Sequence, residues 1–569
     1  MENIKRIAII GGGPSGLFMF KRLVDANRTD LSITIFEKNE QLGKGMPYST
    51  DGARDEHITN VSGNEIPELV TSVTEWIETA PAALLNHYQI TPQKYNDFKV
   101  LPRLLFGQYL VAQFELLLAK ATAAGILDKV YFDSRVTDIT DHPEQQKVTL
   151  QVNGEKLFEY DQVIICTGHR WPAKYEGTVT GYYDSPYPPA KLAIKTNAPV
   201  AVKGSSLTAI DAIRTLARAN GTFTVDDDGV RRYRLADDNA DFKLIMHSRE
   251  GLLPAVRFHL EDPHLSKEGT LTRARMQAHR KENGGFMSLD YLFEHNFKDL
   301  FRDKRPAFYE RIKDMDLETF VAGMMDLREY VEPFQLFKAE YAEAERSIKR
   351  KESVYWKEVL AILSYSMNYP AKYLSAEDSL RLQKVLMPLI SIVIAFVPQS
   401  SCEEIMALHQ AGVLEIIAVG GDSHVEPGKN TGAVYYYTDT DGQPQAVAFD
   451  TFVDCVGQPH LAFEDLPFKS LISRQTVSPA RLRFKDAAAG KEALKQGDDH
   501  IETDGKGNYY LRVPGIAIND SFQPIDDYGA FNDRIYVMAV PYIGGFNPDY
   551  SGLDFCEAAS DAIIKNMFN

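Results

Sequence analysis

The sequence predicts an α/β fold with two units in which a buried strand runs through a glycine-rich turn into a helix, together with a mainly helical insertion. Three observations predict it. Residues 7–23, IAIIGGGPSGLFMFKRL, combine an apolar β-branched run, a cluster of glycines and apolar positions at helical spacing. Residues 199–213, PVAVKGSSLTAIDAI, repeat that order. Residues 261–390 are heavily charged, carry apolar stripes at helical spacing and contain few strand signals.

Length and composition indicate an acidic globular protein of two or three domains. The 569 residues exceed what one core holds, and 44% hydrophobic with 25% charged residues is ordinary for a globular chain. The net charge of −17 repels phosphates, which argues against a nucleic-acid partner. No apolar run reaches the roughly 20 residues that span a bilayer, and the first residues lack a signal-peptide layout. We therefore expect a cytoplasmic protein with no membrane partner.

The cysteines and histidines do not point to a metal site. The four cysteines lie far apart, none forms a C-x-x-C pair, and we expect buried, reduced thiols. The sequence contains no H-E-x-x-H motif and no cluster of cysteine and histidine. His247 and His259 are expected to be hydrogen-bonded or solvated histidines and not ligands.

The first glycine turn has the spacing G-x-G-x-x-G, and its context gives that weak motif weight. A buried strand precedes it, a helix follows, and a second strand, SITIFEK, ends at an acidic residue about 20 residues later, as in a Rossmann unit. There the helix N-terminus faces a pyrophosphate and the acid accepts ribose hydroxyls. A bare structural turn is the alternative. The expected cofactor contacts are Gly11, Gly13, Pro14, Ser15, Gly16, Glu37 and Lys38.

Two later segments favour FAD over NAD at this first unit. YDQVIICTGHR, residues 160–170, runs from an apolar strand into Thr167 and Gly168 and resembles the strand-end signature of two-dinucleotide flavoproteins. Residues 532–545 and the helix after them resemble the C-terminal strand and helix of those proteins, with Gly552, Leu553 and Asp554 at the helix start. The usual Gly-Asp after that strand is absent, and Val540-Pro541 stands there instead.

These stretches together resemble the bacterial FAD/NAD(P)-binding proteins, distant relatives of the flavin-containing and N-hydroxylating monooxygenases. The resemblance covers roughly residues 1–260 and 390–569. The segments that carry it, besides GGGPSG, are EKNEQLGKGMPYST (37–50), HITNVSGNEIPE (57–68), LPRLLFGQYL (101–110), PVAVKGSSLTAIDAI (199–213) and SREGLLP (248–254).

The resemblance implies further FAD contacts, and each has a structural alternative. Lys44, Gly45 and Met46 would lie along the ribityl chain, Asn60 and Val61 near the flavin ring, Arg103 beside the diphosphate or ribose, and Val136 beside the adenine. Alternatively, Lys44 is a solvated surface lysine and Arg103 pairs with a carboxylate inside the fold. Asn60 then only caps a turn, and Met46 only packs.

The second glycine turn departs from the template because serine replaces its middle glycine. Serine is small enough to admit a phosphate, although close backbone approach is lost. Arg249 follows the second strand of this unit, where a cation meets the 2′-phosphate of NADPH, and Glu250 opposes that phosphate. The alternative is a scaffold that no longer binds nucleotide. Asp211 is expected to be a solvated or helix-start carboxylate. The expected contacts are Gly204, Ser206, Leu207, Thr208 and Arg249.

The whole pattern predicts an FAD-dependent NAD(P)H oxidoreductase, with a flavin monooxygenase acting on a small molecule as the favoured activity. A flavin reductase or oxidase, and a protein with a structural or sensory flavin, are the alternatives. No catalytic residue is named, because a flavin carries such chemistry itself. Substrate identity and oligomeric state stay open. The expected domains are FAD-binding at 1–195 and 461–569, NAD(P)-binding-like at 196–260 and 391–460, and a helical insertion at 261–390.

Overall fold

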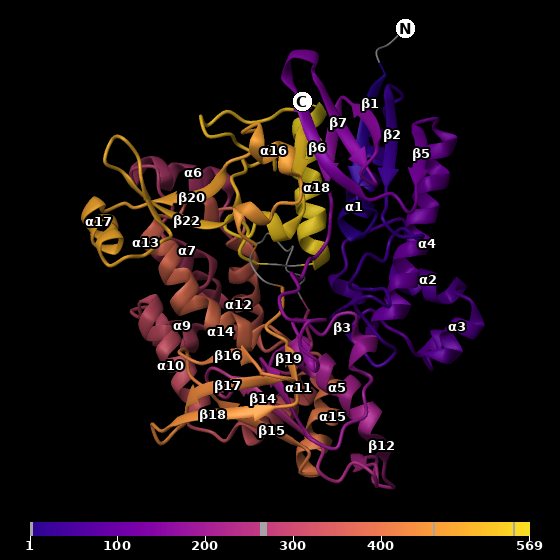
Figure 1. Ribbon diagram of the computed structural model, residues 1–569, viewed down its shortest axis with the longest axis vertical. Helices are drawn as coiled ribbons and strands as arrows, with labels where there is room; N and C mark the ends of the chain where they lie inside the picture. Colours follow the sequence, from indigo (N-terminus) through magenta and orange to yellow (C-terminus); the bar gives the residue numbers. More distant parts are fainter. Residues whose placement is uncertain (1–3, 262–269, 459–460, 550–551, 569) are drawn as a thin grey trace.

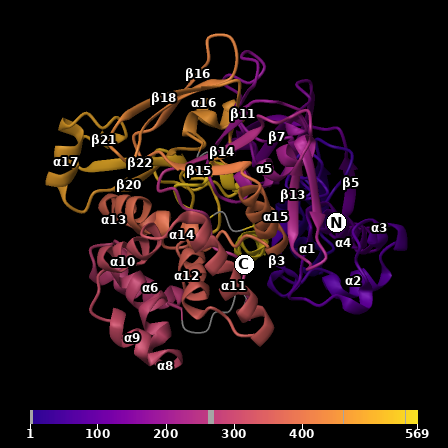
Figure 2. The same cartoon turned by 90° about the horizontal axis from the view of Figure 1, so that it is seen from below.

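The computed structural model describes residues 4–261, 270–458, 461–549 and 552–568. They form two five-stranded parallel sheets with flanking helices, here called the first and second lobes, and a group of helices, here called the helical body (Figure 1). Figure 2 shows the helical body gathered on one side of the molecule, away from helices α2 (Val73–Thr79) and α3 (Ala82–His87) of the first lobe.

The first lobe is built on a sheet in the order β23-β9-β1-β2-β5, with all neighbours parallel. Its central strand β1 is apolar from Ile7 to Ile10 because both faces are covered by other elements there, and Ile7, Ala8 and Ile9 are completely buried. The elements are β1 (Lys5–Ile10), β2 (Leu31–Phe36), β5 (Leu127–Tyr131), β9 (Gln162–Ile165), β23 (Ile535–Val537), α1 (Pro14–Asp25), α4 (Arg103–Ala123) and α18 (Gly552–Phe568).

The second lobe repeats this arrangement of parallel strands, except that its edge strand β10 precedes the other strands along the chain whereas β23 follows them. Its sheet has the order β10-β19-β11-β14-β15, so that β11, β14, β15, β19 and β10 correspond to β1, β2, β5, β9 and β23. The prediction of two Rossmann-type units is confirmed. The elements are β10 (Tyr182–Tyr183), β11 (Pro199–Lys203), β14 (Lys243–Ser248), β15 (Leu414–Ala418), β19 (Thr451–Asp454), α5 (Leu207–Asn220) and α15 (Gln399–Gln410).

The helical body has a core of its own, in which Leu289, Leu360 and Leu363 are completely buried. This confirms the mainly helical insertion. Its helices are α6 (Arg273–Glu282), α7 (Leu289–Asn296), α8 (Phe301–Lys304), α9 (Pro306–Ile312), α10 (Leu317–Glu329), α11 (Pro333–Arg350), α12 (Tyr355–Ser366), α13 (Ala376–Arg381) and α14 (Met387–Val393).

Smaller antiparallel sheets are attached to both lobes. Turns at residues 226–229 and 439–442 close the hairpins β12–β13 and β17–β18. The bounds are β3 (Ile58–Ser62), β4 (Val100–Pro102), β6 (Val136–His142), β7 (Lys147–Val152), β8 (Lys156–Tyr160), β12 (Gly221–Val225), β13 (Arg231–Leu235), β16 (His424–Pro427), β17 (Ala433–Thr438), β18 (Pro444–Phe449), β20 (Pro479–Arg483), β21 (Ile501–Thr503), β22 (Tyr509–Ile516), α16 (Lys469–Ser473) and α17 (Ala487–Lys495).

Helix α4 is apolar because it lies in the core of the first lobe. Of the helices in the described ranges, it alone has the length and composition to cross a membrane. Leu105, Leu110 and Leu117 are completely buried, and Phe114 stacks on Phe20 of α1 at 5.4 Å between ring centroids. Its apolar surface is therefore covered by the protein itself.

The four cysteines are buried and unpaired, as expected. His247 differs from expectation. It is buried, neither ring nitrogen has a hydrogen-bond partner, and its ring stacks on Tyr435 at 4.0 Å. Burial lowers the pKa of His247 to about 4, so the imidazole is neutral at pH 7.

Candidate functional site

The turn after β1 brings three backbone segments closer together than a side chain permits. Gly11 has φ +101°, and a Cβ on it would lie 2.7 Å from the carbonyl oxygen of Cys166 at the end of β9. A Cβ on Gly16 would lie 2.1 Å from the carbonyl oxygen of Gly11. These two glycines are thus required by the packing of β1, β9 and α1 itself.

Gly13 has a different role, because its conformation is open to any residue. Its φ is −76°, and a Cβ would lie 3.1 Å from the Cα atom of Gly45. Pro14 opens α1, where a missing N–H costs nothing, and Ser15 follows with its Oγ 3.3 Å from the Sγ atom of Cys556 on α18. The N-termini of α1 and α18 therefore converge beside a cradle bounded by Gly13 and Gly45.

Glu37 lies at the other end of this cradle. Its buried carboxylate accepts hydrogen bonds from the amides of Gly12 at 2.7 Å and Asn39 at 2.9 Å. Each oxygen thus uses one of its two acceptor positions and retains the other for a ribose hydroxyl. Lys38 is exposed, and Val136 begins β6 two residues after Ser134, whose amide bonds the Glu37 carbonyl.

Helix α4 aligns the chain that leads from this cradle to β3. A Cβ on Gly43 would lie 2.7 Å from the Leu110 carbonyl oxygen, and a Cβ on Gly107 would lie 2.2 Å from that of Tyr48. One turn further, the Arg103 amide donates to the His57 carbonyl at 2.8 Å. Positions 103, 107 and 110 share one face of α4 and span about 10 Å at 1.5 Å per residue. The chain therefore runs along α4 from Gly45 to β3.

A pocket of about 320 Å³ opens beside this chain, between residues 39–50, α3 and α4. Lys44 and Gly45 line it. Lys44 is half-buried and forms no ion pair with a described residue, and burial lowers its pKa. Met46 is half-buried and packs on Gly52, as in the packing alternative. Lys44 is therefore not a fully solvated surface lysine.

On β3, Asn60 is exposed and Val61 half-buried, while Arg103 is committed to a contact inside the protein. The Arg103 Nη1 atom lies 2.7 Å from a carboxylate oxygen of Asp211 on α5, and its Nε donates to the Ile58 carbonyl at 3.1 Å. The structure thus shows the internal carboxylate pairing for Arg103. The expectation of a solvated Asp211 is wrong, because its side chain is only 9% exposed.

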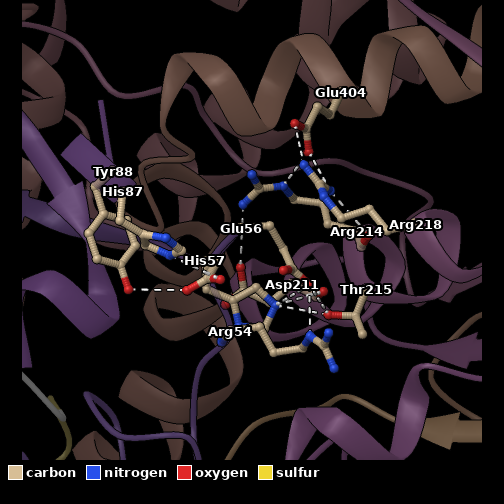
Figure 3. A network of polar contacts seen from close by, with 11 residues as sticks. Arg54, Glu56, His57, His87, Tyr88, Asp211, Arg214, Thr215, Arg218 and Glu404 are labelled. Atoms are coloured by element: carbon tan, nitrogen blue, oxygen red, sulfur yellow. Dashed lines mark hydrogen bonds and ion pairs between the residues drawn. The ribbon is translucent and has the colours of Figure 1, made fainter. Parts of the chain in front are cut away.

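The Arg103–Asp211 pair adjoins a polar network between the lobes. Figure 3 shows this network around His57, Asp211 and Glu404. His57 Nε2 lies 3.2 Å from the Asp211 carbonyl and 3.1 Å from Thr215 Oγ1, and His57 Nδ1 accepts from the Arg54 amide. His57 therefore carries its proton on Nε2, and burial lowers its pKa. Glu404 on α15 accepts from two arginines, Arg214 at 2.7 Å and Arg218 at 2.7 Å. Through the contacts of His57 with Asp211 and Thr215, residues 54–57 join β3 to α5.

The strand-end loops of both sheets meet each other. Thr167 follows β9, and its Oγ1 is buried without a hydrogen-bond partner, whereas Gly168 is exposed. Trp171 Nε1 donates to the Gly457 carbonyl at 3.1 Å, and the Arg170 amide donates to Gln458 at 3.0 Å. These contacts hold together the two segments in which the chain passes from one lobe to the other.

The start of α18 contacts the helical body. Gly552 is the first residue described in the helix and is exposed, whereas Leu553 and Asp554 are buried. The Tyr365 hydroxyl of α12 donates to the Asp554 carbonyl at 3.3 Å, and Ser364 donates to Asp549 at 3.0 Å. The helical body therefore borders the end of the cradle at which α18 begins.

The turn after β11 reproduces the geometry of the first turn. Gly204 has φ +106°, and a Cβ on it would lie 3.0 Å from the Cys455 carbonyl, as at Gly11. Its amide donates to the His247 carbonyl at 2.8 Å, just as the Gly11 amide donates to the Phe36 carbonyl at 2.8 Å. Ser248 therefore occupies the position of Glu37, and Arg249 that of Lys38.

The N-terminus of α5 is accessible where the second nucleotide contacts are expected. Ser206 precedes the helix, is exposed and caps no amide with its side chain, and Leu207 and Thr208 are half-buried. A serine fits there because position 206 is exposed, whereas Gly13 lies against Gly45. Arg249 is 59% exposed and lies 3.7 Å from Glu250.

These features fit a dinucleotide in the first lobe. A side chain at Gly13 would fill the cradle, Glu37 retains free acceptor positions, and the Thr167 hydroxyl is an orphaned buried polar atom at the adjoining strand end. Sequence reasoning missed Asp211, His57, Arg257 and Cys556 as neighbours of this site. Only Asp211 carried a signal, since Arg214 stands one helical turn from it.

Comparison with known proteins agrees with this geometry. Residues 8–170 match the FAD-NAD(P)-binding family, and residues 272–394 match the YdhS-like middle domain. The chain is 28% identical to YdhS of Escherichia coli (strain K12) over 99% of its own length and 98% of that protein.

Two more distant likenesses are a trimethylamine monooxygenase and an ornithine hydroxylase. Trimethylamine monooxygenase of Roseovarius sp. (strain 217) is 29% identical over 29% of this chain and 36% of that protein. The structure of ornithine hydroxylase (PvdA) from Pseudomonas aeruginosa matches 99% of this chain and all of that chain (100%) at 9% identity and a TM-score of 0.47. Residues 8–170 are accordingly identified as an FAD-NAD(P)-binding domain, and residues 272–394 as a YdhS-like middle domain.

Proposed function

We propose that this protein is an FAD-dependent NAD(P)H oxidoreductase of the cytoplasm, and a monooxygenase acting on a small molecule. The observation that carries the proposal is the pair of equivalent glycine turns, one followed by Glu37 and the other by Ser248 and Arg249. An acid at this position accepts ribose hydroxyls, whereas a small residue followed by arginine admits a 2′-phosphate. The two lobes then hold different dinucleotides, FAD first and NADPH second.

We assign the FAD site to the cradle of the first lobe and the NADPH site to the start of α5. The domain limits proposed from the sequence go with this assignment. FAD contacts are assigned to Gly11, Gly13, Pro14, Ser15, Gly16, Glu37, Lys38, Lys44, Gly45, Met46, Asn60, Val61, Val136, Thr167, Gly168, Gly552, Leu553 and Asp554. NADPH contacts are assigned to Gly204, Ser206, Leu207, Thr208 and Arg249.

When bound, the flavin supplies hydride acceptance and reaction with oxygen, and the protein supplies binding, orientation and electrostatics. Glu37 holds the ribose, and the amides at the start of α1 hold the pyrophosphate. The N-terminus of α18 adds a positive dipole end, which favours negative charge on a reduced ring. Arg103 supports β3 through the Ile58 carbonyl, and its expected contact with the FAD diphosphate or ribose stays part of this proposal.

A coupling measurement tests the monooxygenase activity against its alternatives. NADPH consumption, hydrogen peroxide release and incorporation of ¹⁸O from ¹⁸O₂ are followed with a panel of amines, amino acids and sulfides. A monooxygenase gives at least one panel member that gains ¹⁸O while peroxide per NADPH falls. Complete conversion of electrons to peroxide or to an added dye would indicate a reductase or oxidase. A flavin that NADPH does not reduce under anaerobic conditions would indicate a structural or sensory role.

We expect NADPH to be preferred over NADH by about tenfold, and Arg249→Ala to abolish that preference. A charge-assisted contact contributes about 1.5 to 3 kcal/mol, Glu250 reduces it, and 1.4 kcal/mol is about one decade. The measurement is the ratio of anaerobic flavin reduction efficiencies with the two nucleotides. Ser248→Glu should shift the ratio of reduction efficiencies toward NADH, because it places at position 248 the acid that the first lobe has at Glu37.

Arg234→Ala is the matched control, since Arg234 is an exposed arginine on the β13 hairpin of the same lobe. It should leave the ratio unchanged. An unchanged ratio in Arg249→Ala as well would make Arg249 a surface residue without contact to nucleotide.

A further inference from the structure

Arg257 reaches from outside the first lobe into β3. It lies in the connector between β14 of the second lobe and the helical body, and its side chain is only 4% exposed. The guanidinium donates to the Asn60 carbonyl, to Ser62 Oγ at 2.7 Å and to the Glu65 carboxylate. One planar group thus satisfies a carbonyl, a hydroxyl and a carboxylate of a single short segment.

The backbone that carries Arg257 is itself fixed. Its amide donates to the Val397 carbonyl at 2.8 Å, and its carbonyl accepts from the side-chain amide of Gln399 at the start of α15. Three residues later, the Leu260 carbonyl accepts from Asn64 at 3.0 Å. The guanidinium therefore projects from an anchored connector and not from a free loop.

The middle of β3 depends on this contact, because its pairing with β4 is irregular. Ile58 is opposite Pro102 and Ser62 is opposite Val100, and the register shifts between them. The Val61 carbonyl accepts from Thr59 Oγ1 at 2.8 Å, within β3 itself. The Asn60 carbonyl instead has Arg257 as its side-chain partner, so Arg257 sets the orientation of the peptide that joins Asn60 to Val61.

We propose that Arg257 is a positioning residue for bound FAD: it holds the Asn60–Val61 peptide in the orientation that meets the flavin ring. This inference depends on the proposed function, in which β3 faces the ring at the end of the chain segment along α4. Lysine keeps the positive charge that pairs with Glu65. It lacks the planar guanidinium whose two terminal nitrogens bond the Asn60 carbonyl and the Glu65 carboxylate at the same time.

Arg257→Lys tests the proposal, with Arg534→Lys as the matched control. Arg534 is another buried arginine of a bidentate pair, with Asp141 at 2.8 Å, and it joins β6 to the segment before β23. Each variant is purified as the full chain. Melting temperature without FAD, FAD affinity by fluorescence quenching and the visible absorption of bound FAD are measured. For Arg257→Lys we expect about tenfold weaker FAD binding and a shifted flavin absorption band.

Arg534→Lys should lower the melting temperature and leave the flavin absorption of the wild type. Loss of stability in Arg257→Lys with wild-type affinity and absorption would overturn the proposal, and so would equal spectral shifts in both variants. Asn60→Ala separates this inference from the proposed function. If it alters the flavin absorption and Arg257→Lys does not, only the role of Arg257 fails. If neither does, β3 is not at the ring and the proposed flavin placement fails with it.

Discussion

Replacing Gly13 with valine is expected to leave the protein folded but without FAD. The backbone at Gly13 is in a region open to every residue, so a side chain there causes no backbone strain and requires only a small shift of the loop at Gly45. The first added carbon, however, would already lie 3.1 Å from Gly45, in the space assigned to the pyrophosphate. Loss of two charge-assisted amide contacts at about 1.5 kcal/mol each weakens FAD binding about 100-fold. The measurements are FAD per polypeptide after purification and affinity for added FAD.

Gly323→Val is the control for this expectation. Gly323 lies in α10 of the helical body, where a Cβ has nothing within 4 Å, so the same substitution should leave FAD content unchanged. A fully flavinated Gly13→Val protein would remove the first turn from the FAD site. Gly16 is not a suitable test residue, because a Cβ there meets the Gly11 carbonyl at 2.1 Å and breaks the turn before any cofactor binds.

The first Rossmann unit was predictable because its glycines are required where neighbouring segments of the same supersecondary unit pack closely against each other. Gly11 and Gly16 are glycines since β1, α1 and β9 approach within the length of a side chain. That requirement is independent of the rest of the protein, so a motif of a few residues is enough to predict the unit. The strand–turn–helix order around Gly204 was predictable for the same reason.

The serine in the second turn becomes understandable only in three dimensions. At Gly13 the loop around Gly45 passes within van der Waals distance, whereas Ser206 is exposed. The sequence of the turn does not reveal whether another segment covers it. In the same way, the equivalence of Ser248 with Glu37 follows from hydrogen-bond register between strands and not from counting along the chain.

The contacts between the lobes could not be predicted, because they join segments with no local pattern in common. Arg103 begins a helix of the first lobe, and Asp211 lies in a helix of the second, over a hundred positions away along the sequence. Both residue types are usually solvated on helices, which made a solvated Asp211 the natural expectation. Arg257 stands in a connector without periodicity, and although its neighbours Val256 and Phe258 are apolar, nothing in the sequence indicates which segment the arginine contacts.

Asp211→Asn is expected to lower the free energy of unfolding by about 3 kcal/mol, because it leaves the buried Arg103 guanidinium without its counterion. Burial acts to lower the pKa of Arg103, but the Asp211 carboxylate stabilises the cation and the pKa is raised above its ordinary value. Arg103 also holds the Ile58 carbonyl, and the network of His57 and Thr215 adjoins the same turn of α5. The measurement is urea unfolding of the variant and of the wild type.

Glu415→Gln provides the comparison, since it removes the carboxylate of a half-exposed pair with Lys243 at 2.8 Å on β14. Exposed pairs contribute about 0.2 to 1 kcal/mol, so this variant should stay within that range. The double replacement Arg103→Met with Asp211→Leu should recover most of the loss, because it removes both buried charges and leaves apolar groups of similar size. Equal small losses in Asp211→Asn and Glu415→Gln would mean that the Arg103–Asp211 pair is solvated, and the two lobes would then be held together by their remaining contacts alone.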